Sequence, residues 1–131
     1  MDFALFIKVP LGSGWSPPSG AEATLNPGEA AFVLLRGNDL TNTFAGEVLQ
    51  GNLTNKLVPG FNLVGNIIPD SITISPPSAG SRIAQWDVAL QDYQIFPSGE
   101  WPPRMPTIAA GEGFFVRTSV PIEWVRNFST P

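Results

Sequence analysis

The side chains that could carry chemistry in this sequence are carboxylates, because the chain contains no histidine and no cysteine. Their absence removes the usual general base near neutral pH, thiol nucleophiles, disulfides, and zinc, haem or iron–sulfur ligation by those residues. A glycosidase-type pair of carboxylates, one acting as acid and one as base, is the familiar mechanism that stays open. Its candidates are Glu29, Glu47, Glu100, Glu112, Glu123, Asp87 and Asp92.

Two of these glutamates belong to an approximate internal repeat. The segment Thr24–Val33 recurs as Thr107–Val116, so that Gly28-Glu29 matches Gly111-Glu112 at an offset of 83. Trp15 and Trp101, upstream of the two segments, are 86 residues apart. The unit is therefore about 85 residues long, and the chain holds one and a half units, a half-unit at 1–52 and a full unit at 53–131.

The duplication favours a structural role for the repeated glutamates. A catalytic carboxylate gains nothing from a twin, whereas a glutamate that accepts turn amides, or pairs with Arg36 or Arg117, is needed in each copy. We therefore expect no catalytic residue and no enzymatic activity. The structural turn residues are expected to be Gly28, Glu29, Gly111 and Glu112.

Aromatic side chains support a different activity, the binding of carbohydrate on exposed rings. Trp15 and Trp101 are each followed by a proline within two residues, so we expect them in loops, exposed, and forming a platform together with Tyr93. Trp86 and Trp124 lie inside strand patterns and are expected to point inward as core residues. Polar side chains that could bind the same sugar are Asn62, Asn66, Gln91 and Asp92.

Other partners receive little support from the composition. The seven basic residues are scattered in a chain of net charge −4, so we expect no nucleic-acid partner. No segment approaches the ~18 to 20 apolar residues of a membrane span. Calcium would need oxygen ligands at a recognisable spacing, which no three of the loop candidates show, so we expect no metal and no cofactor. Those loop candidates are Asn38, Asp39, Asp70 and Asp87.

The amino terminus also bears on location. Met1–Val9 has an acid at its second position and no basic stretch before its apolar residues, so it does not resemble a signal peptide. The sequence as it stands predicts a cytoplasmic protein. A module excised from a secreted protein would instead be extracellular.

The elements that position these residues are expected to be short strands. Gly (13) and Pro (14) are abundant, and charged residues are only 14% against a usual ~25%, which argues against helical bundles. A hydrophobic content of 43% argues against disorder. Apolar runs alternate with turn residues along the chain. The eight expected strands are Phe3–Val9, Ala30–Arg36, Thr43–Val48, Phe61–Ile67, Arg82–Trp86, Tyr93–Phe96, Gly113–Thr118 and Ile122–Phe128.

These strands predict a single all-β domain over residues 1–131. The expected architecture is an antiparallel β-sandwich or flattened barrel of about eight strands. We expect the two Gly-Glu strands in pseudo-symmetric positions. Because one repeat unit is incomplete, a second copy that covers the exposed edge or face is the alternative, which predicts a homodimer.

Several segments of the chain together resemble a known type of repeat. It is an uncharacterised β-rich repeat with a Gly-Glu-Gly-Phe-Phe core, found in large secreted proteins of environmental bacteria, including the verrucomicrobial and planctomycete groups. The resemblance implies a module without assigned chemistry, and a short reading frame cut from such an array is typical of mobile gene cassettes. The matching segments are Val58–Asn66, Ile83–Asp87, Tyr93 with Phe96, Glu100-Trp101-Pro102 and Ala110–Val116.

The sequence thus predicts a non-enzymatic structural or interaction module. A carbohydrate-binding module that uses exposed tryptophans is the first alternative. A homo-oligomeric assembly module is the second.

Overall fold

The structure is a computed structural model, which describes residues 24–33, 47–74, 77–100 and 104–130, together with the backbone of 7–8 and 15–16. Apart from the 3-10 turn η2 (Ser98–Glu100), the regular elements of these residues are strands. No helix in these ranges has the length and hydropathy needed to cross a membrane. The strands are β1 (Ile7–Lys8), β2 (Trp15–Ser16), β3 (Gly51–Leu57), β4 (Gly60–Gly65), β5 (Ile72–Thr73), β6 (Arg82–Asp87), β7 (Asp92–Pro97), β8 (Thr107–Ile108), β9 (Gly113–Thr118) and β10 (Ile122–Phe128).

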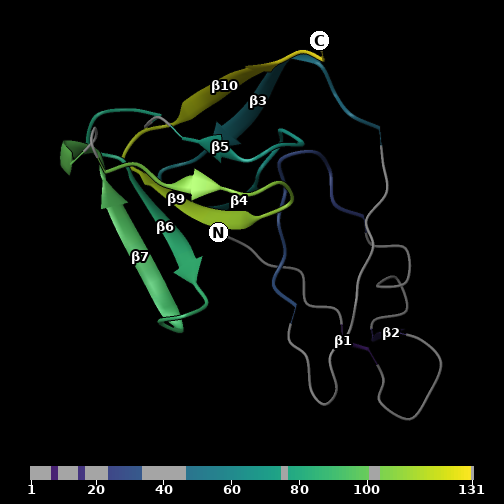
Figure 1. Cartoon of the computed structure of the whole chain (residues 1–131), viewed down its shortest axis with the longest axis horizontal. Helices are drawn as coiled ribbons and strands as arrows, with labels where there is room; N and C mark the ends of the chain where they lie inside the picture. The colour runs from purple at the N-terminus through teal and green to yellow at the C-terminus, as the bar shows by residue number, and fades with distance from the viewer. Residues whose placement is uncertain are drawn as a thin grey trace.

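The largest sheet has four antiparallel strands in the order β4-β9-β6-β7 (Figure 1). Side chains alternate between its two faces with a period of two residues. In β9, Phe114 and Val116 point to the inner face and are fully buried, whereas Phe115 and Arg117 point to the outer face. β6 pairs with β9 only over Arg82–Ala84, so the far end of the β6–β7 hairpin extends past β9.

The core lies between this inner face and two smaller antiparallel sheets, β3–β10 and β5–β8. The ring of Phe114 meets Trp124 of β10 edge to face, with 6.2 Å between ring centroids. Burying large apolar side chains in this way is the main favourable term in folding. The buried cluster consists of Leu57, Val64, Ile74, Ile83, Phe96, Ile108, Phe114, Val116 and Trp124.

The chain passes from the small β3–β10 sheet to the large sheet at a sharp corner. Val58 and Pro59 lead from β3 into β4, and Gly60 adopts a positive φ of 100° that favours glycine. The side-chain amide of Asn62 holds this corner, because its Oδ1 accepts the amide of Val58 and its Nδ2 donates to the Val58 carbonyl. Thr118, at the end of β9, donates its hydroxyl to the carbonyl of Val120 at the return crossing.

The structure confirms the prediction of an all-β chain with antiparallel sheets. Predicted strands at β9 and β10 match in both bounds, and those at β4, β6 and β7 match within two residues at each end. The barrel alternative is wrong, because the sheets do not close on themselves.

Other strand predictions are wrong or fall outside the described residues. Residues 30–33 and 47–48 form no strand, and the only pairing near them is an isolated bridge between Glu29 and Val64 within the described ranges. Of Phe3–Val9, only the backbone of Ile7–Lys8 is described, as β1. Strand β3 is absent from the sequence prediction. Its inward positions are Leu53, Asn55 and Leu57, and the polar Asn55 among them interrupts the apolar alternation that predicts a strand.

Candidate functional site

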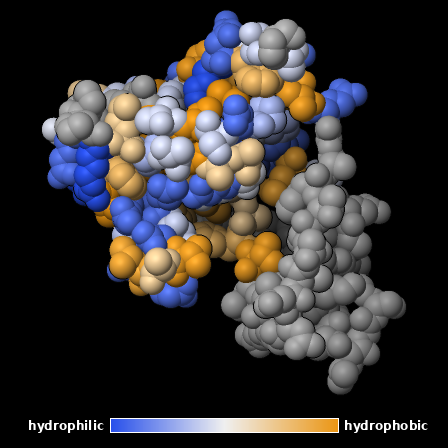
Figure 2. All heavy atoms as spheres, in the orientation of Figure 1, coloured by the Kyte–Doolittle hydropathy of each residue, from blue (hydrophilic) through white to orange (hydrophobic). Residues whose placement is uncertain are grey.

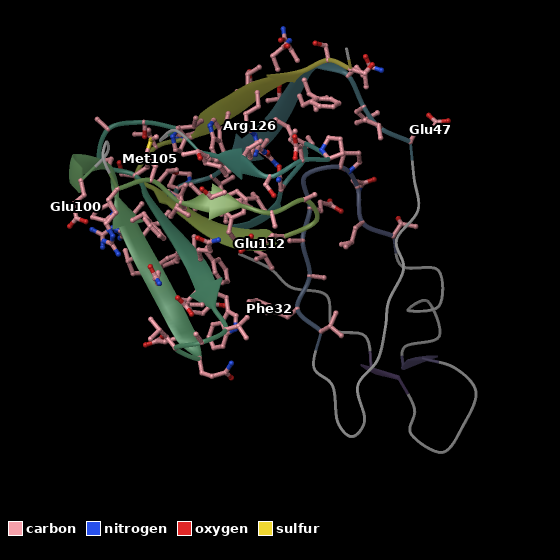
Figure 3. All side chains as sticks on the ribbon, viewed as in Figure 1. Phe32, Glu47, Glu100, Met105, Glu112 and Arg126 are labelled. Carbon is pink, nitrogen blue, oxygen red and sulfur yellow. The ribbon has the colours of Figure 1, made fainter. Side chains whose placement is uncertain are left out.

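The carboxylates proposed for acid–base chemistry lie in separate parts of the molecule. Glu47, Glu100 and Glu112 are far apart in Figure 3. Glu29 forms an isolated bridge with Val64 of β4, in the large sheet, whereas Glu123 lies on β10 in a different sheet. Asp87 and Asp92 are the exception, because they are cross-strand partners at the end of the β6–β7 hairpin.

The pair at the end of the hairpin is held by turn hydrogen bonds. Asp87 accepts the backbone amides of Ala89 and Leu90 and the side-chain amide of Gln94, and Asp92 accepts the amide of Tyr93. The Leu90 amide first, and then Gln94, lower the pKa of Asp87 below its ordinary value. A carboxylate that acts as a general acid needs a raised pKa, so this environment suits a turn and not acid catalysis.

Both Gly-Glu pairs form the same kind of turn. Glu29 donates its amide to the carbonyl of Asn26 and accepts the Asn26 amide with its carboxylate, at 2.9 and 2.8 Å. Glu112 makes the same two hydrogen bonds to Ala109, at 3.1 and 2.7 Å. The glycine before each glutamate has a positive φ, 86° at Gly28 and 74° at Gly111, as residue three of a type II turn requires.

The two turns also hold one strand from both sides. The carbonyl of Gly28 accepts the amide of Gly65 and the carbonyl of Glu112 accepts the amide of Asn66, both at 2.9 Å. Glu112 in addition accepts a hydrogen bond from Gln85 of β6. Of the two expected structural roles, the glutamates therefore fill the first, accepting turn amides. The alternative ion pair of Glu112 with Arg117 is not formed, and Arg36 lies outside the described residues.

The predicted carbohydrate platform is described only at Tyr93. Trp101 lies outside the described residues, and of Trp15 only the backbone in β2 is described. The amides of Asn62 and Asn66 are engaged in turns, with Asn66 donating to the carbonyls of Asp70 and Ala109. They are therefore not available to a ligand.

Tyr93 instead belongs to a row of aromatic rings across the outer face of the four-stranded sheet. Its ring lies 5.1 Å from that of Trp86 and 5.7 Å from that of Phe115, and Phe115 lies 6.1 Å from Phe61. Trp86 is 42% exposed and Phe61 is 51% exposed. The prediction that Trp86 points inward is wrong. Trp86 lies on the outer side of β6 together with Ala84, whereas Ile83 lies on the inner side and is buried. The same prediction for Trp124 is confirmed, because that side chain is buried in the core.

The pleat and the strand register define the whole outer face. Its residues come from all four strands and include no Lys, Asp, Glu, Asn, Gln or Ser. Aromatic and aliphatic residues dominate, with two arginines at one end. The outer face, as the term is used below, consists of Phe61, Leu63, Arg82, Ala84, Trp86, Tyr93, Ile95, Pro97, Phe115 and Arg117.

A pair of glycines lets another segment cross beside this face. Gly65 and Gly113 are cross-strand partners, and a Cβ on Gly65 would come within 2.5 Å of the carbonyl oxygen of Glu29. A Cβ on Gly113 would lie 3.0 Å from the Cβ of Ala30. Because neither glycine has a side chain, the segment runs close to the sheet, and Phe32 packs on Phe115 with 5.7 Å between centroids (Figure 3).

The two arginines of the outer face are directly opposite each other on β6 and β9. Arg82 and Arg117 are cross-strand partners, both are exposed, and Arg117 lies over the ring of Phe61 at 5.8 Å. Neither forms an ion pair within the described part of the chain. Like charges directly opposite on a sheet are destabilising, so folding does not favour this arrangement.

The free edge of β7, by contrast, is blocked by side chains. Arg104 donates to the carbonyl of Ile95 at 3.2 Å, forms an ion pair with Glu100 at 2.9 Å and lies over the ring of Phe96. The amide of Tyr93 is taken by Asp92. Engaging edge groups in this way prevents another strand from pairing there.

Two further features of the described residues are a groove and a partly buried arginine. An open groove of about 690 Å³ runs between the two Gly-Glu turns, but its lining is mostly apolar and the Asn66 amide in it is engaged. On the inner side of β10, Arg126 donates to Asn55 and stacks on Trp124, and its Nε and Nη1 are buried without a partner (Figure 3). Burial lowers the pKa of Arg126 to about 10.

No cluster of three or more acidic side chains in the described ranges is placed to hold a metal ion. Asp70 binds the amide of Ser71, while Asn38 and Asp39 lie outside those ranges. Comparisons with family models, curated proteins and solved structures each gave no match to this chain.

Sequence reasoning missed the outer face, although one signal was present. Phe114 and Phe115 are adjacent, and adjacent residues of a strand point to opposite faces, so a large aromatic must lie on each side of β9. Which residues of β4 and β6 lie beside Phe115 depends on the pairing register of these strands with β9. The sequence alone does not predict this register.

Proposed function

We propose that this chain is a non-enzymatic protein-interaction module whose contact surface is the outer face of the four-stranded sheet. The observation that carries the proposal is the composition of that face. Aromatic residues and arginine are enriched in protein interfaces, whereas Lys, Glu, Asp and Ser are depleted, and the outer face follows this pattern throughout. Contiguous apolar surface of this kind marks interaction sites on soluble proteins.

The engagement of four of the candidate carboxylates in turn hydrogen bonds supports the same proposal. Asp87 and Asp92, the one pair of candidate carboxylates at neighbouring positions, are engaged in turn hydrogen bonds. The glutamates of the Gly-Glu turns bind backbone amides. The matching hydrogen bonds of these two turns also support the proposed repeat and its sandwich-like arrangement, with β3–β10 opposite the large sheet.

The test is a selection of peptides from a random display library on the purified chain, with counter-selection on the double variant Phe61→Ser/Trp86→Ser. We expect enriched peptides to bind this variant about tenfold more weakly, which is 1.4 kcal/mol. The control variant Val125→Ser removes an equally exposed apolar side chain from β10 and should keep full binding. Peptides that bind all three proteins equally would contradict the proposal.

Carbohydrate binding is the second candidate, because Tyr93 and Trp86 present their rings next to each other. A glycan array separates the two functions. A glycan that binds the natural chain and is lost in Tyr93→Ala would favour the carbohydrate function, while binding that survives in both Tyr93→Ala and Trp101→Ala would exclude this platform.

A further inference from the structure

We infer that the outer face binds an extended peptide segment of another protein, in which one carboxylate bridges Arg82 and Arg117 and an apolar side chain lies two residues away on either side. This inference rests on the proposed function, because it names the chemistry of the partner of the same face. The binding site is the row of residues that crosses the sheet at its arginine end, called the arginine row below. It consists of Phe61, Arg117, Arg82 and Pro97, from β4, β9, β6 and β7 in that order.

The strand register makes the four residues of the arginine row direct neighbours. Phe61 is the cross-strand partner of Arg117, and Arg117 is that of Arg82. Arg82 is in turn the cross-strand partner of Pro97. Pro97 is half-buried, and the other three side chains are exposed. The arginine row is therefore a continuous strip of accessible side chains across all four strands.

The segment that crosses beside the outer face covers a different part of it. A Cβ on Gly113 would lie 3.0 Å from the Cβ of Ala30, and Phe32 packs on Phe115. Arg117 lies two residues further along β9, about 6.6 Å beyond Phe115 at about 3.3 Å per residue. The exposure of Arg117 agrees with this distance. The covered part of the face thus ends before the arginine row.

Both charges of the outer face are positive and lie in the middle of the arginine row. Arg82 and Arg117 are direct cross-strand partners, and like charges in such positions repel each other. Within the described ranges the only ion pair joins Arg104 and Glu100, so neither arginine of the row has a carboxylate partner there. The free end of the β6–β7 hairpin is different, because hydrophobic side chains gather at it in Figure 2. A carboxylate from a partner would therefore bind at the arginine row, where it relieves the repulsion.

Guanidinium groups suit a carboxylate by shape as well as by charge. Each presents a planar fork of N–H donors that matches the two oxygens of a carboxylate. Arg117 also lies over the ring of Phe61 at 5.8 Å, a contact that favours one orientation of its side chain. Because the two arginines stand on adjacent strands, about 4.8 Å apart, one carboxylate can accept hydrogen bonds from both.

The spacing of the row determines which residues flank the carboxylate. With strands about 4.8 Å apart, the point midway between the arginines lies about 7 Å from Phe61 and about 7 Å from Pro97. In an extended peptide, alternate residues point the same way and lie about 6.6 Å apart. A peptide that runs along the row with its acid at this midpoint therefore places two side chains over Phe61 and Pro97. The matching sequence pattern is apolar-x-acid-x-apolar.

The composition of the row favours a peptide over other anions. Its four side chains contain no amide or hydroxyl group that could bind sugar hydroxyls, so an acidic polysaccharide would be held by charge alone. Nucleic acids present many negative charges, and a chain of net charge −4 repels them. A single carboxylate between two apolar side chains avoids most of that repulsion.

The test is a titration of the isotope-labelled chain, followed by NMR, with the synthetic peptide Leu-Thr-Glu-Thr-Leu blocked at both ends. We expect saturable shifts of the amide signals of Phe61 and Arg117. The matched peptide Leu-Thr-Gln-Thr-Leu, which lacks the charge, should bind about tenfold more weakly, as the loss of a charged hydrogen-bond partner predicts. Binding of the acidic peptide should also weaken in about 1 M salt, where the screening length falls to about 3 Å. Equal binding of the two peptides, or no binding of either, would overturn the inference.

Variants of the two arginines identify the contact itself. Arg82→Gln/Arg117→Gln should bind the acidic peptide about tenfold more weakly and should no longer distinguish it from the neutral one. The control variant Lys56→Gln removes an exposed positive charge from β3 and should keep the full difference. The unfolding midpoint of the arginine variant should be unchanged or higher, because a repulsive pair is removed. A lower midpoint would show that these arginines serve folding, which contradicts the inference.

The outcomes separate this inference from the proposed function. If library peptides require Phe61 and Trp86 but contain no acid and still bind Arg82→Gln/Arg117→Gln, the inference fails and the proposed function stands. If they depend on neither the rings nor the arginines, both proposals fail. Binding of an oligogalacturonate that requires the arginines, without binding of the acidic peptide, would make an acidic polysaccharide the partner and would overturn the inference.

Discussion

Both faces of the four-stranded sheet carry large apolar side chains, yet only the inner face is closed to solvent. Phe114 and Phe115 show the difference at adjacent positions of β9, because Phe114 is 1% exposed and Phe115 is only partly buried among other outer-face rings. Burial in the core accounts for the inner residues. The outer residues stay partly open to solvent and do not complete the core, as the proposed contact surface requires.

The largest expected effect tests this difference directly. Phe114→Ala should lower the free energy of unfolding by about 3 to 5 kcal/mol, the usual loss when a buried phenylalanine leaves a cavity. Phe115→Ala removes a ring that contacts other rings but faces solvent. Its loss in the free energy of unfolding should therefore be less than about half of the loss in Phe114→Ala. Urea unfolding of both variants measures the two values. Equal losses would show that the outer face is part of the core.

The same contrast between covered and open surroundings separates the two Gly-Glu turns. A Cβ at Gly28 would collide with the side-chain amide of Asn55, while one at Gly111 meets nothing within 4 Å. Gly111→Ala should therefore cost only the left-handed backbone strain, about 1 to 2 kcal/mol, and Gly28→Ala should cost about 1 kcal/mol more. Gly99→Ala, with open space and no positive φ, is the control. Thermal unfolding measures the loss of stability in each variant. A larger loss in Gly111→Ala than in Gly28→Ala would refute the steric explanation.

The smallest expected effect concerns the one charge that points inward from β10. Arg126 is partly buried and two of its nitrogens have no partner, whereas Arg82 and Arg117 on the outer face reach solvent. Arg126→Met should raise the free energy of unfolding by about 1 kcal/mol at neutral pH, because it removes an uncompensated charge. A loss of stability would show that stacking on Trp124 and the bond to Asn55 outweigh that charge.

The pH dependence of this variant has a definite sign. The pKa of Arg126 is lowered to about 10 in the folded chain, well below its ordinary value, so the unfolded chain binds the proton more tightly. Proton release in the folded state therefore increases stability as the pH rises above about 10. The advantage of Arg126→Met should be constant below pH 10 and shrink above it, as urea unfolding at neutral pH and at the highest pH that keeps the chain folded would measure.

The sequence predicts the parts of this fold in which one alternation dominates. Strands β9 and β10 are predicted in both bounds because each is an apolar run that lies between clear turn residues. Strand β3 was missed because its inward set includes Asn55, whose burial depends on a hydrogen bond to Gly28 far away in the chain. Local pattern contains no information on that partner.

The candidate site was less predictable than the strands. Tyr93 was identified as a platform residue, but Trp86 was assigned to the core because tryptophan in a strand is usually buried. Its outward position follows from that of Ile83, which lies on the opposite side of β6 and is completely buried in the core. Arg82 lies opposite Arg117 because of the register between β6 and β9. These two residues are 35 positions apart in the chain, so local sequence does not predict that they meet.

The guanidinium of Arg104 also limits what can be added to the four-stranded sheet at β7. An open edge strand can pair with a strand of another chain and so begin an ordered aggregate. At this edge the guanidinium already takes the carbonyl of Ile95. We therefore expect strands of other chains not to add at β7 in concentrated solutions of this protein.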